Sequence, residues 1–308
     1  MASLRLRLHH IRSIVPAACC SLAASLFPFL PDFLNWTALA ALAVTAQTAF
    51  AQGAGDPNAA LANEVIVVPL AGRSISALVT HQPGATTFTH AIALFPGSPG
   101  AMNLRVEDGR ILYGLGGNFL VRARRHFIED GVLTVVVDAP SDQQPNFYQG
   151  FRETPRYGED VKGVVDAVSG KFGALDWTFI GTSEGSVSAV HAARMLPADA
   201  RRVVLTASVV SPSQRGRGIE VSDVRQVKIP ILWVHHRNDP CKYTQYSRVR
   251  NYAEQTTTPL VSVTGASQAR GDPCQAFSEH GFVGMEIKTI KAILSWIRTG
   301  QVPADIAE

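Results

Sequence analysis

The 308-residue sequence has little charge of either sign and no cluster of basic residues. Lys and Arg number 28 and Asp and Glu number 25, which gives a net charge of only +3. Proteins that bind nucleic acids typically carry a concentrated basic patch, so the sequence indicates no nucleic-acid partner. Hydrophobic residues make up 46% of the chain, which is the proportion expected of a globular protein that buries a core.

Long apolar runs are also missing from the first 51 residues. A membrane-spanning helix needs about 20 consecutive apolar residues, whereas prolines interrupt this region at positions 16, 28 and 31. An uncleaved membrane anchor is therefore disfavoured. Three arginines precede the apolar runs, and the last run ends in Ala49-Phe50-Ala51, a typical cleavage signature. We predict an export signal over residues 1–51 that is cleaved near Ala51, a linker over 52–62 and a folded domain over 63–308. The mature chain is then expected to be periplasmic or secreted, with no stable membrane span.

Cysteine is scarce, with four residues in the chain. Cys19 and Cys20 fall within the predicted signal, and a lipid anchor on Cys19 is disfavoured because Pro16 stands where such a signal has leucine. Cys241 and Cys274 remain. In an oxidising compartment a pair of this kind usually forms a disulfide. Two unrelated free thiols are the alternative.

After residue 62, apolar runs alternate with amphipathic stretches. Strands that are apolar throughout are typical of a mostly parallel sheet with helices on both faces. No internal repeat or domain-breaking linker interrupts the pattern, so we expect one α/β domain. The predicted strands cover 63–70, 74–81, 89–95, 132–138, 177–181, 201–208, 228–236 and 259–265. The predicted helices lie near 117–130, 158–170, 184–196 and 243–255, and a C-terminal helix has Ile287, Ile290, Leu294 and Ile297 on one face.

The stretch "WTFIGTSEGSVSAV" joins a predicted strand to a predicted helix. Its Gly181-x-Ser183-x-Gly185 spacing is the G-x-S-x-G pattern of a nucleophile elbow. At such a turn, flanking side chains larger than hydrogen would collide with the neighbouring strand and helix. The turn lifts the serine hydroxyl above the sheet and points the helix N-terminus toward it. We predict that Ser183 is a nucleophile; an ordinary Ser/Gly turn is the alternative.

A serine hydroxyl is a poor nucleophile until a base takes its proton, so the chain should supply a histidine and an acid that orients it. Ligands of open α/β sheets bind beyond the carboxyl ends of the strands. Asp239 follows a predicted strand, and His280 lies between the last strand and the last helix. We predict that they are the acid and the base. Asp138 also follows a strand but precedes the serine, so we expect it to shape the site. The alternative bases are His235 and His236.

A turn rich in glycine and proline follows the predicted strand 89–95, in the sequence Phe95-Pro96-Gly97-Ser98-Pro99-Gly100. Backbone N–H groups aimed at a developing oxyanion stabilise acyl-transfer transition states. We predict that the amides of Ser98 and Glu184 form this oxyanion hole. A plain turn is the alternative.

Together, the serine elbow, the Pro-Gly-Ser-Pro-Gly turn, the strand-end aspartate and the His-Gly-Phe loop resemble the α/β-hydrolase superfamily over residues 64–299. The resemblance implies a twisted sheet of about eight strands and acyl transfer by Ser183, Asp239 and His280. The His-Gly-Phe loop is also similar to dienelactone-hydrolase-like members, which have cysteine in place of Ser183. Pro96 replaces the histidine that usually precedes the oxyanion glycine. The interval 209–227 is too short for a large lid, so an open site is expected.

The two remaining cysteines fit this interpretation. Cys241 lies two residues after Asp239, and Cys274 lies six residues before His280. If both loops converge on Ser183, the cysteines come close together. A disulfide between them would tie the acid loop to the base loop.

The leading functional hypothesis is an exported serine hydrolase that cleaves a small-molecule carboxylic ester and needs no metal or organic cofactor. A peptidase or amidase, a cofactor-free perhydrolase, and a non-catalytic binding protein on a hydrolase scaffold are the alternatives. The sequence indicates neither the substrate nor the oligomeric state. Five residues in loops are candidates to border an acyl pocket, with packing roles as the alternative: Met102, Leu104, Tyr113, Phe147 and Tyr148.

Overall fold

The computed structural model describes residue 58, residues 60–144 and residues 147–308, all of which belong to one compact unit from Ala54 to Glu308. The predicted export signal and most of the predicted linker lie outside the described residues. Asn58, within that linker, is buried, and its side-chain oxygen accepts a hydrogen bond from the Arg125 N–H at 3.2 Å. None of the helices in these ranges has the length and apolar composition needed to cross a membrane.

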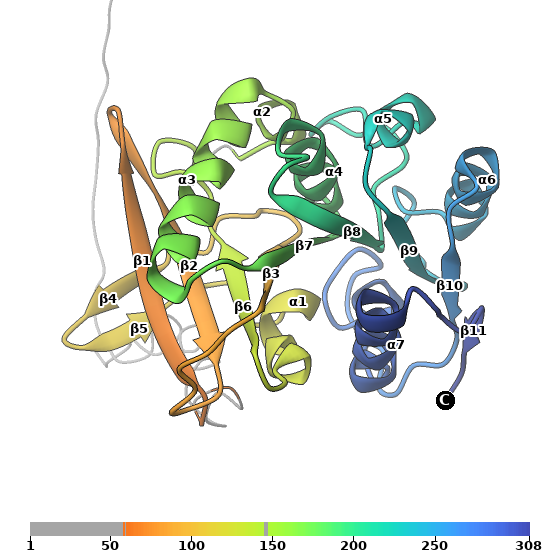
Figure 1. Cartoon of the computed structure of the whole chain (residues 1–308). Coiled ribbons are helices and arrows are strands. Elements are labelled where there is room, and N and C mark those ends of the chain that lie inside the picture. Colours follow the sequence, from red (N-terminus) through yellow and green to blue (C-terminus); the bar gives the residue numbers. More distant parts are fainter. Residues whose placement is uncertain (1–57, 59, 145–146) are drawn as a thin grey trace, which may run out of the picture. The chain divides into compact units, whose positions relative to one another are not determined.

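A nine-stranded sheet forms the centre of this unit, in the order β1-β2-β6-β3-β7-β8-β9-β10-β11 (Figure 1). β2 pairs antiparallel with β1 and β6, and every other pair in the sheet is parallel. A separate antiparallel hairpin consists of β4 (Arg105–Glu107) and β5 (Arg110–Leu112). The strands of the sheet are β1 (Ala62–Leu70), β2 (Arg73–His81), β3 (His90–Phe95), β6 (Val132–Val137), β7 (Asp176–Thr182), β8 (Ala200–Thr206), β9 (Ile231–His236), β10 (Leu260–Val263) and β11 (Asp305–Ile306).

Helices cover both faces of the sheet (Figure 1). Successive side chains along each central strand point to opposite faces and belong to two different apolar clusters, so both faces are apolar and are buried under helices. On β3, for example, Ala93 belongs to one cluster and Leu94 to the other. α3 (Pro155–Phe172), α4 (Gly185–Met195), α5 (Val221–Gln226) and α6 (Tyr246–Thr256) contribute to the first cluster. α1 (Phe119–Arg122), the 3₁₀ helix η1 (Arg124–Phe127) and α7 (Glu286–Thr299) contribute to the second.

Local chemistry accounts for several boundaries. α3 begins with Pro155, whose fixed φ suits the first helical turn, and the side chain of Thr154 accepts a hydrogen bond from the Tyr157 N–H at 3.3 Å. The helix ends at Gly173 with a φ of 95°, a conformation that glycine adopts without a Cβ penalty. β9 begins at Ile231, directly after a proline that has no N–H to donate to the sheet.

The predicted α/β architecture is confirmed, with several differences in detail. The helix expected near 117–130 is two short helices, α1 and η1, which are separated at Ala123. Ile287 is 50% exposed in the first turn of α7, so only three of the four predicted residues on that face are buried. Besides the eight expected strands, the structure contains β11 and the β4–β5 hairpin. Two short helices were not expected either: α2 (Gln149–Arg152) and α5.

Candidate active site

Ser183 lies between β7 and α4 with a φ of +53°, a conformation that costs a non-glycine residue conformational energy. The flanking glycines are required by space. A Cβ on Gly181 would lie 2.2 Å from the Gly185 carbonyl oxygen, and a Cβ on Gly185 would lie 1.9 Å from the Phe95 carbonyl oxygen. The G-x-S-x-G spacing therefore forms a strained strand-to-helix turn, with the backbone of β3 packed against it.

Asp239 and His280 come together from two loops that follow neighbouring strands. Asp239 follows β9, and His280 lies in the 3₁₀ helix η3 (Glu279–Gly281), between β10 and α7. The His280 Nδ1 is 3.0 Å from the Asp239 Oδ2, and both side chains are buried. The acid and the histidine selected from the sequence are therefore hydrogen-bonded partners.

Two further groups hold the Asp239 carboxylate. The Cys241 N–H donates to Oδ1 at 2.9 Å, and the Thr244 hydroxyl donates to Oδ2 at 2.8 Å. Burial acts to raise the pKa of Asp239, but the hydrogen bond and the charge of His280, together with His235 and the Cys241 N–H, hold the pKa below its ordinary value. The carboxylate is thus ionised at neutral pH.

Ser183 and His280 line the same cavity, which has a volume of about 730 Å³. No hydrogen bond joins their side chains in the described part of the chain. Catalytic hydrogen bonds are often long before substrate binds, so this geometry is compatible with a nucleophile and its base.

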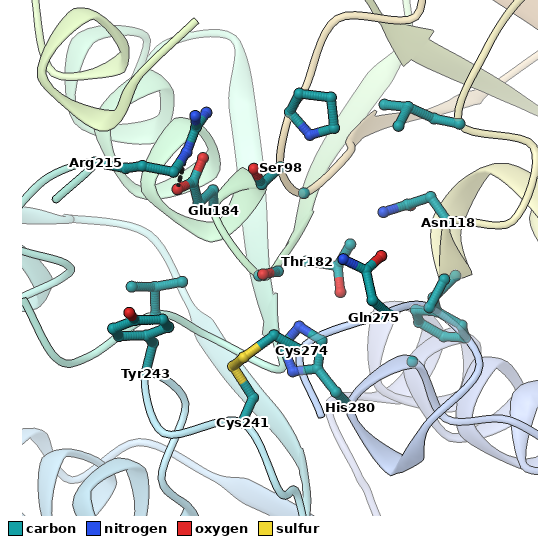
Figure 2. A pocket seen from close by; sticks show the side chains of 18 of the residues that line it. Ser98, Asn118, Thr182, Glu184, Arg215, Cys241, Tyr243, Cys274, Gln275 and His280 are labelled. Carbon is teal, nitrogen blue, oxygen red and sulfur yellow. Dashed lines mark hydrogen bonds and ion pairs between the residues drawn. A yellow bond between two sulfur atoms is a disulfide. The ribbon is translucent and has the colours of Figure 1, made fainter. Parts of the chain in front are cut away.

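The predicted disulfide between Cys241 and Cys274 is confirmed, with a Cα–Cα distance of 4.6 Å. Figure 2 shows it beside His280, on the wall of the cavity. Because Cys241 lies in the loop of Asp239 and Cys274 lies in the loop of His280, the bridge joins the two loops covalently.

The turn after β3 lies directly against Ser183, since a Cβ on Gly97 would be 2.8 Å from the Ser183 Cβ. Ser98 and Glu184 both line the cavity, and neither backbone N–H donates a hydrogen bond to another residue in the described ranges. Both residues thus line the cavity of Ser183 with a backbone N–H that has no partner among the described residues.

Asp138, at the end of β6, holds the segment that follows this turn. Its carboxylate accepts from the Met102 N–H at 2.6 Å, the Leu104 N–H at 2.8 Å and the Ala139 N–H at 2.7 Å. Burial raises the pKa of Asp138, although these backbone hydrogen bonds oppose the effect. Asp138 thus fixes the backbone of residues 102–104, and its expected effect on the site stays a prediction.

The Glu184 side chain is held by groups that the sequence analysis did not identify. Arg215 Nε donates to the Glu184 Oε1 at 2.6 Å, and the Gln149 amide donates to the same oxygen at 3.4 Å. Thr244, which bonds to Asp239, was missed as well. None of these residues belongs to a recognisable motif; only their contacts across the fold connect them to the site.

The five loop residues that were candidates for the acyl pocket do not line the cavity. Met102 and Phe147 are buried in the core, and Tyr113 packs under Arg124, whose guanidinium carbon is 5.3 Å from the ring centroid. Tyr148 is 44% exposed outside the cavity, and Leu104 is buried in the core. Figure 2 shows Asn118 and Gln275 on one side of the cavity and Tyr243 and Arg215 on the other. Apolar lining comes from Leu115, Phe119, Val209, Ala276 and Phe277.

The two alternative bases have structural partners instead. His235 Nε2 accepts the Ser208 N–H at 2.5 Å, and burial lowers the pKa of His235 to about 3. His236 Nε2 bonds to the Gly265 carbonyl at 2.9 Å. Neither histidine lines the cavity.

No protein-family model and no curated protein sequence matches the chain. Solved structures do. An α/β serine hydrolase homologue from Coxiella burnetii matches with a TM-score of 0.51 and 19% identity, over 74% of this chain and 94% of that one. Est1E from Butyrivibrio proteoclasticus, with ferulic acid bound, matches with a TM-score of 0.52 and 14% identity, over 75% and 99%. A cold-adapted esterase from an Arctic intertidal metagenomic library matches with a TM-score of 0.51 and 13% identity, over 75% and 95%. The chain therefore has the α/β-hydrolase fold.

Proposed function

We propose that the protein is a serine hydrolase that cleaves a carboxylic ester through an acyl-enzyme formed on Ser183. The observation that carries this proposal is a histidine, bonded to a buried acid, that shares a cavity with a strained serine. His280 is 3.0 Å from Asp239 and lines the same cavity as Ser183, which lies on the elbow. Nucleophile, base and orienting acid are the three parts that this chemistry requires.

Each residue has a distinct role in this reaction. The Nδ1–H of His280 donates a hydrogen bond to Asp239, so the Nε2 can accept the proton of the Ser183 hydroxyl as the oxygen attacks the ester carbonyl. The negative charge then develops on the former carbonyl oxygen, beside the free amides of Ser98 and Glu184. His280 returns the proton to the leaving alcohol, and water attacks the acyl-enzyme by the same steps.

The lowered pKa of Asp239 suits this cycle. An ionised carboxylate fixes the Nδ1–H tautomer of His280 and stabilises the imidazolium that forms in each half-reaction. Thr244 and the Cys241 amide supply two of the hydrogen bonds that hold the carboxylate in place. The site can therefore transfer protons without protonating its own acid.

An ester is the favoured substrate because one of the structural neighbours is described as a cold-adapted esterase. The cavity has amide and hydroxyl groups beside apolar walls, and among its described lining residues the only Asp, Glu, Lys or Arg are the paired Arg215 and Glu184. This lining suits a neutral small molecule. The disulfide between the acid and base loops supports export, because such bonds persist in oxidising compartments.

An active-serine phosphonate probe tests the proposal. We expect the purified domain to be labelled at Ser183 and to hydrolyse p-nitrophenyl esters, and we expect Ser183→Ala to lose both properties. Labelling with turnover of acyl-peptides alone would identify a peptidase. A parent protein that binds ligand but shows neither labelling nor turnover would refute the proposal and favour a binding protein.

A further inference from the structure

Arg152, the last residue of α2, is a buried arginine that the steps above do not use. It is only 1% exposed, and its Nη1 donates to the Ser188 hydroxyl at 2.8 Å. Among the residues that the structure describes, its Nε and Nη2 have no hydrogen-bond partner. A guanidinium carries five N–H donors and stays protonated in proteins, so this is a largely unsatisfied buried cation.

The guanidinium lies between the two segments that supply the free amides. A Cβ on Gly100, at the end of the turn that contains Ser98, would lie 2.1 Å from Nη2. Ser188, its hydrogen-bond partner, lies one turn into α4, the helix that begins after Glu184. The ring of Phe147 covers the guanidinium, with its centroid 3.9 Å from the central carbon. The guanidinium of Arg152 therefore fills the space between the turn and the helix.

The charges around Arg152 do not cancel. The ionisable groups that act on it are Tyr157, Glu184 and Arg215. Glu184 is already bonded to Arg215 through Oε1, and its Oε2 is buried without a partner. Burial lowers the pKa of Arg152, which the nearby Tyr157 and Glu184 oppose. Arg152, Arg215 and Glu184 together carry a net positive charge, and the Arg152 guanidinium lies against Gly100 and Ser188, in the segments that carry the two amides.

Burying an unpaired charge is strongly unfavourable. For this reason, removing one partner of a buried ion pair, which leaves the other charge unpaired, strongly destabilises a protein. A fixed positive charge has its greatest effect where a negative charge develops in surroundings that exclude water. Such a charge develops on the carbonyl oxygen of the ester, which becomes the oxyanion beside Ser98 and Glu184. The arrangement favours the transition state over the neutral substrate, because the substrate carries no charge for it to attract.

We propose that Arg152 is a positioning residue of the oxyanion hole, acting through Glu184 and the turn at residues 97–100 and contributing positive potential there. This inference rests on the proposed function of Ser183. It predicts that the charge of residue 152 affects kcat and the binding of charged tetrahedral analogues more than it affects KM.

Two substitutions separate charge from packing. Arg152→Met keeps much of the apolar volume and removes the charge, whereas Arg152→Lys keeps the charge and loses the planar fork. Hydrolysis of p-nitrophenyl acetate is measured per active site, as titrated with a fluorophosphonate, so misfolded protein is not counted. Phenylboronic acid, which forms an anionic tetrahedral adduct with an active serine, reports binding of the transition-state charge.

For Arg152→Met we expect kcat to fall about 30-fold, below the effect typical of losing a direct oxyanion donor. The Ki of phenylboronic acid should rise by a similar factor, while KM changes less than about threefold. Arg152→Lys should retain more activity than Arg152→Met. The matched control is Arg156→Met, which removes a guanidinium stacked 5.0 Å from the Phe151 ring and paired with Asp142 at the surface. It should leave all three quantities unchanged.

The results distinguish the two proposals. A parent protein that the fluorophosphonate does not label contradicts the proposed function and the inference with it. A labelled, active parent whose Arg152→Met variant equals or exceeds Arg152→Lys contradicts the inference alone. If Arg152→Met does not fold, Ser188→Ala decides, because it frees Nη1 without removing the arginine. It should raise the Ki of phenylboronic acid several-fold, and an unchanged Ki overturns the inference.

Discussion

Replacing both bridged cysteines by serine, in Cys241→Ser/Cys274→Ser, tests how strongly the disulfide stabilises the folded domain. The bridge closes a separation of 33 residues. In the chain-entropy model, a loop of this length stabilises the fold by about 3.7 kcal/mol at 25 °C. For a domain of roughly 250 residues, this free energy corresponds to a decrease in Tm of about 7 °C.

Activity should respond differently from stability. The bond from His280 to Asp239 and the support from Thr244 and the backbone of residue 241 do not involve sulfur. We therefore expect the variant to retain most of its kcat per titrated serine at temperatures well below its Tm. The bridge would then contribute to the free energy of unfolding, while the hydrogen bonds align the side chains of the site.

The assay combines thermal unfolding, followed by circular dichroism, with ester hydrolysis at 25 °C. The parent protein treated with a reductant is the matched control, because it loses the bridge without a change of sequence. Both samples should show the same decrease in Tm. A Tm within about 2 °C of the oxidised parent would refute the entropy argument. A folded variant that has lost all activity would refute the division between stability and alignment.

Three substitutions of single polar groups give further predictions. Asp239→Asn should lower kcat about 10⁴-fold, because an amide favours the wrong tautomer of His280; a loss below about 100-fold would contradict the role of the acid. The pKa of Asp239 is lower in the folded state, so its contribution to stability is present above the unfolded pKa and is lost as pH falls through the folded pKa. Urea unfolding of the parent at decreasing pH should show this loss, and Asp239→Asn should lack it. Thr244→Val removes a 2.8 Å hydrogen bond and should lower the free energy of unfolding by about 1 kcal/mol and reduce kcat several-fold; unchanged kinetics would show that the hydroxyl does not position the acid. Asp138→Asn places an N–H₂ group against one of the backbone donors and should cost about 1–3 kcal/mol of stability by urea unfolding, and a stability equal to the parent would show that the carboxylate does not hold the segment after the turn.

The parts of the fold that depend on short-range chemistry could be predicted from the sequence. Continuous apolar runs identified the strands because strands of a parallel sheet are buried on both faces. The elbow was recognisable because its two glycines have a fixed spacing in the sequence. Space requires both of them: a Cβ on Gly181 would collide with Gly185, and a Cβ on Gly185 would collide with the Phe95 backbone. The hydrogen bond from His280 to Asp239 followed from their positions after neighbouring strands.

The cavity lining could not be predicted, because the direction of a loop side chain depends on distant contacts. Met102 was a candidate for the pocket, but Asp138 binds the backbone of its segment and the side chain lies in the core. The sequence around Arg152 gives no sign of its burial, since Gly100 and Ser188 are needed to show where the guanidinium lies. The break at Ala123 likewise has no local signal such as glycine or proline.

The strand order explains why the proposed acid, base and nucleophile come from these particular loops. Ser183 follows β7 and Asp239 follows β9, with β8 between them. Strands in a sheet lie about 4.8 Å apart, so these two positions are separated by about 10 Å, too far for a direct hydrogen bond. An imidazole and its two hydrogen bonds span a gap of this size, and His280 reaches it from the loop after β10. β3 is the other neighbour of β7, which is why Gly97 lies directly against Ser183 and the turn that carries Ser98 is on the side opposite Asp239. The sheet order thus accounts for the position of the proposed acid on one side of the serine and of the Ser98 turn on the other, while the Glu184 amide follows the serine directly.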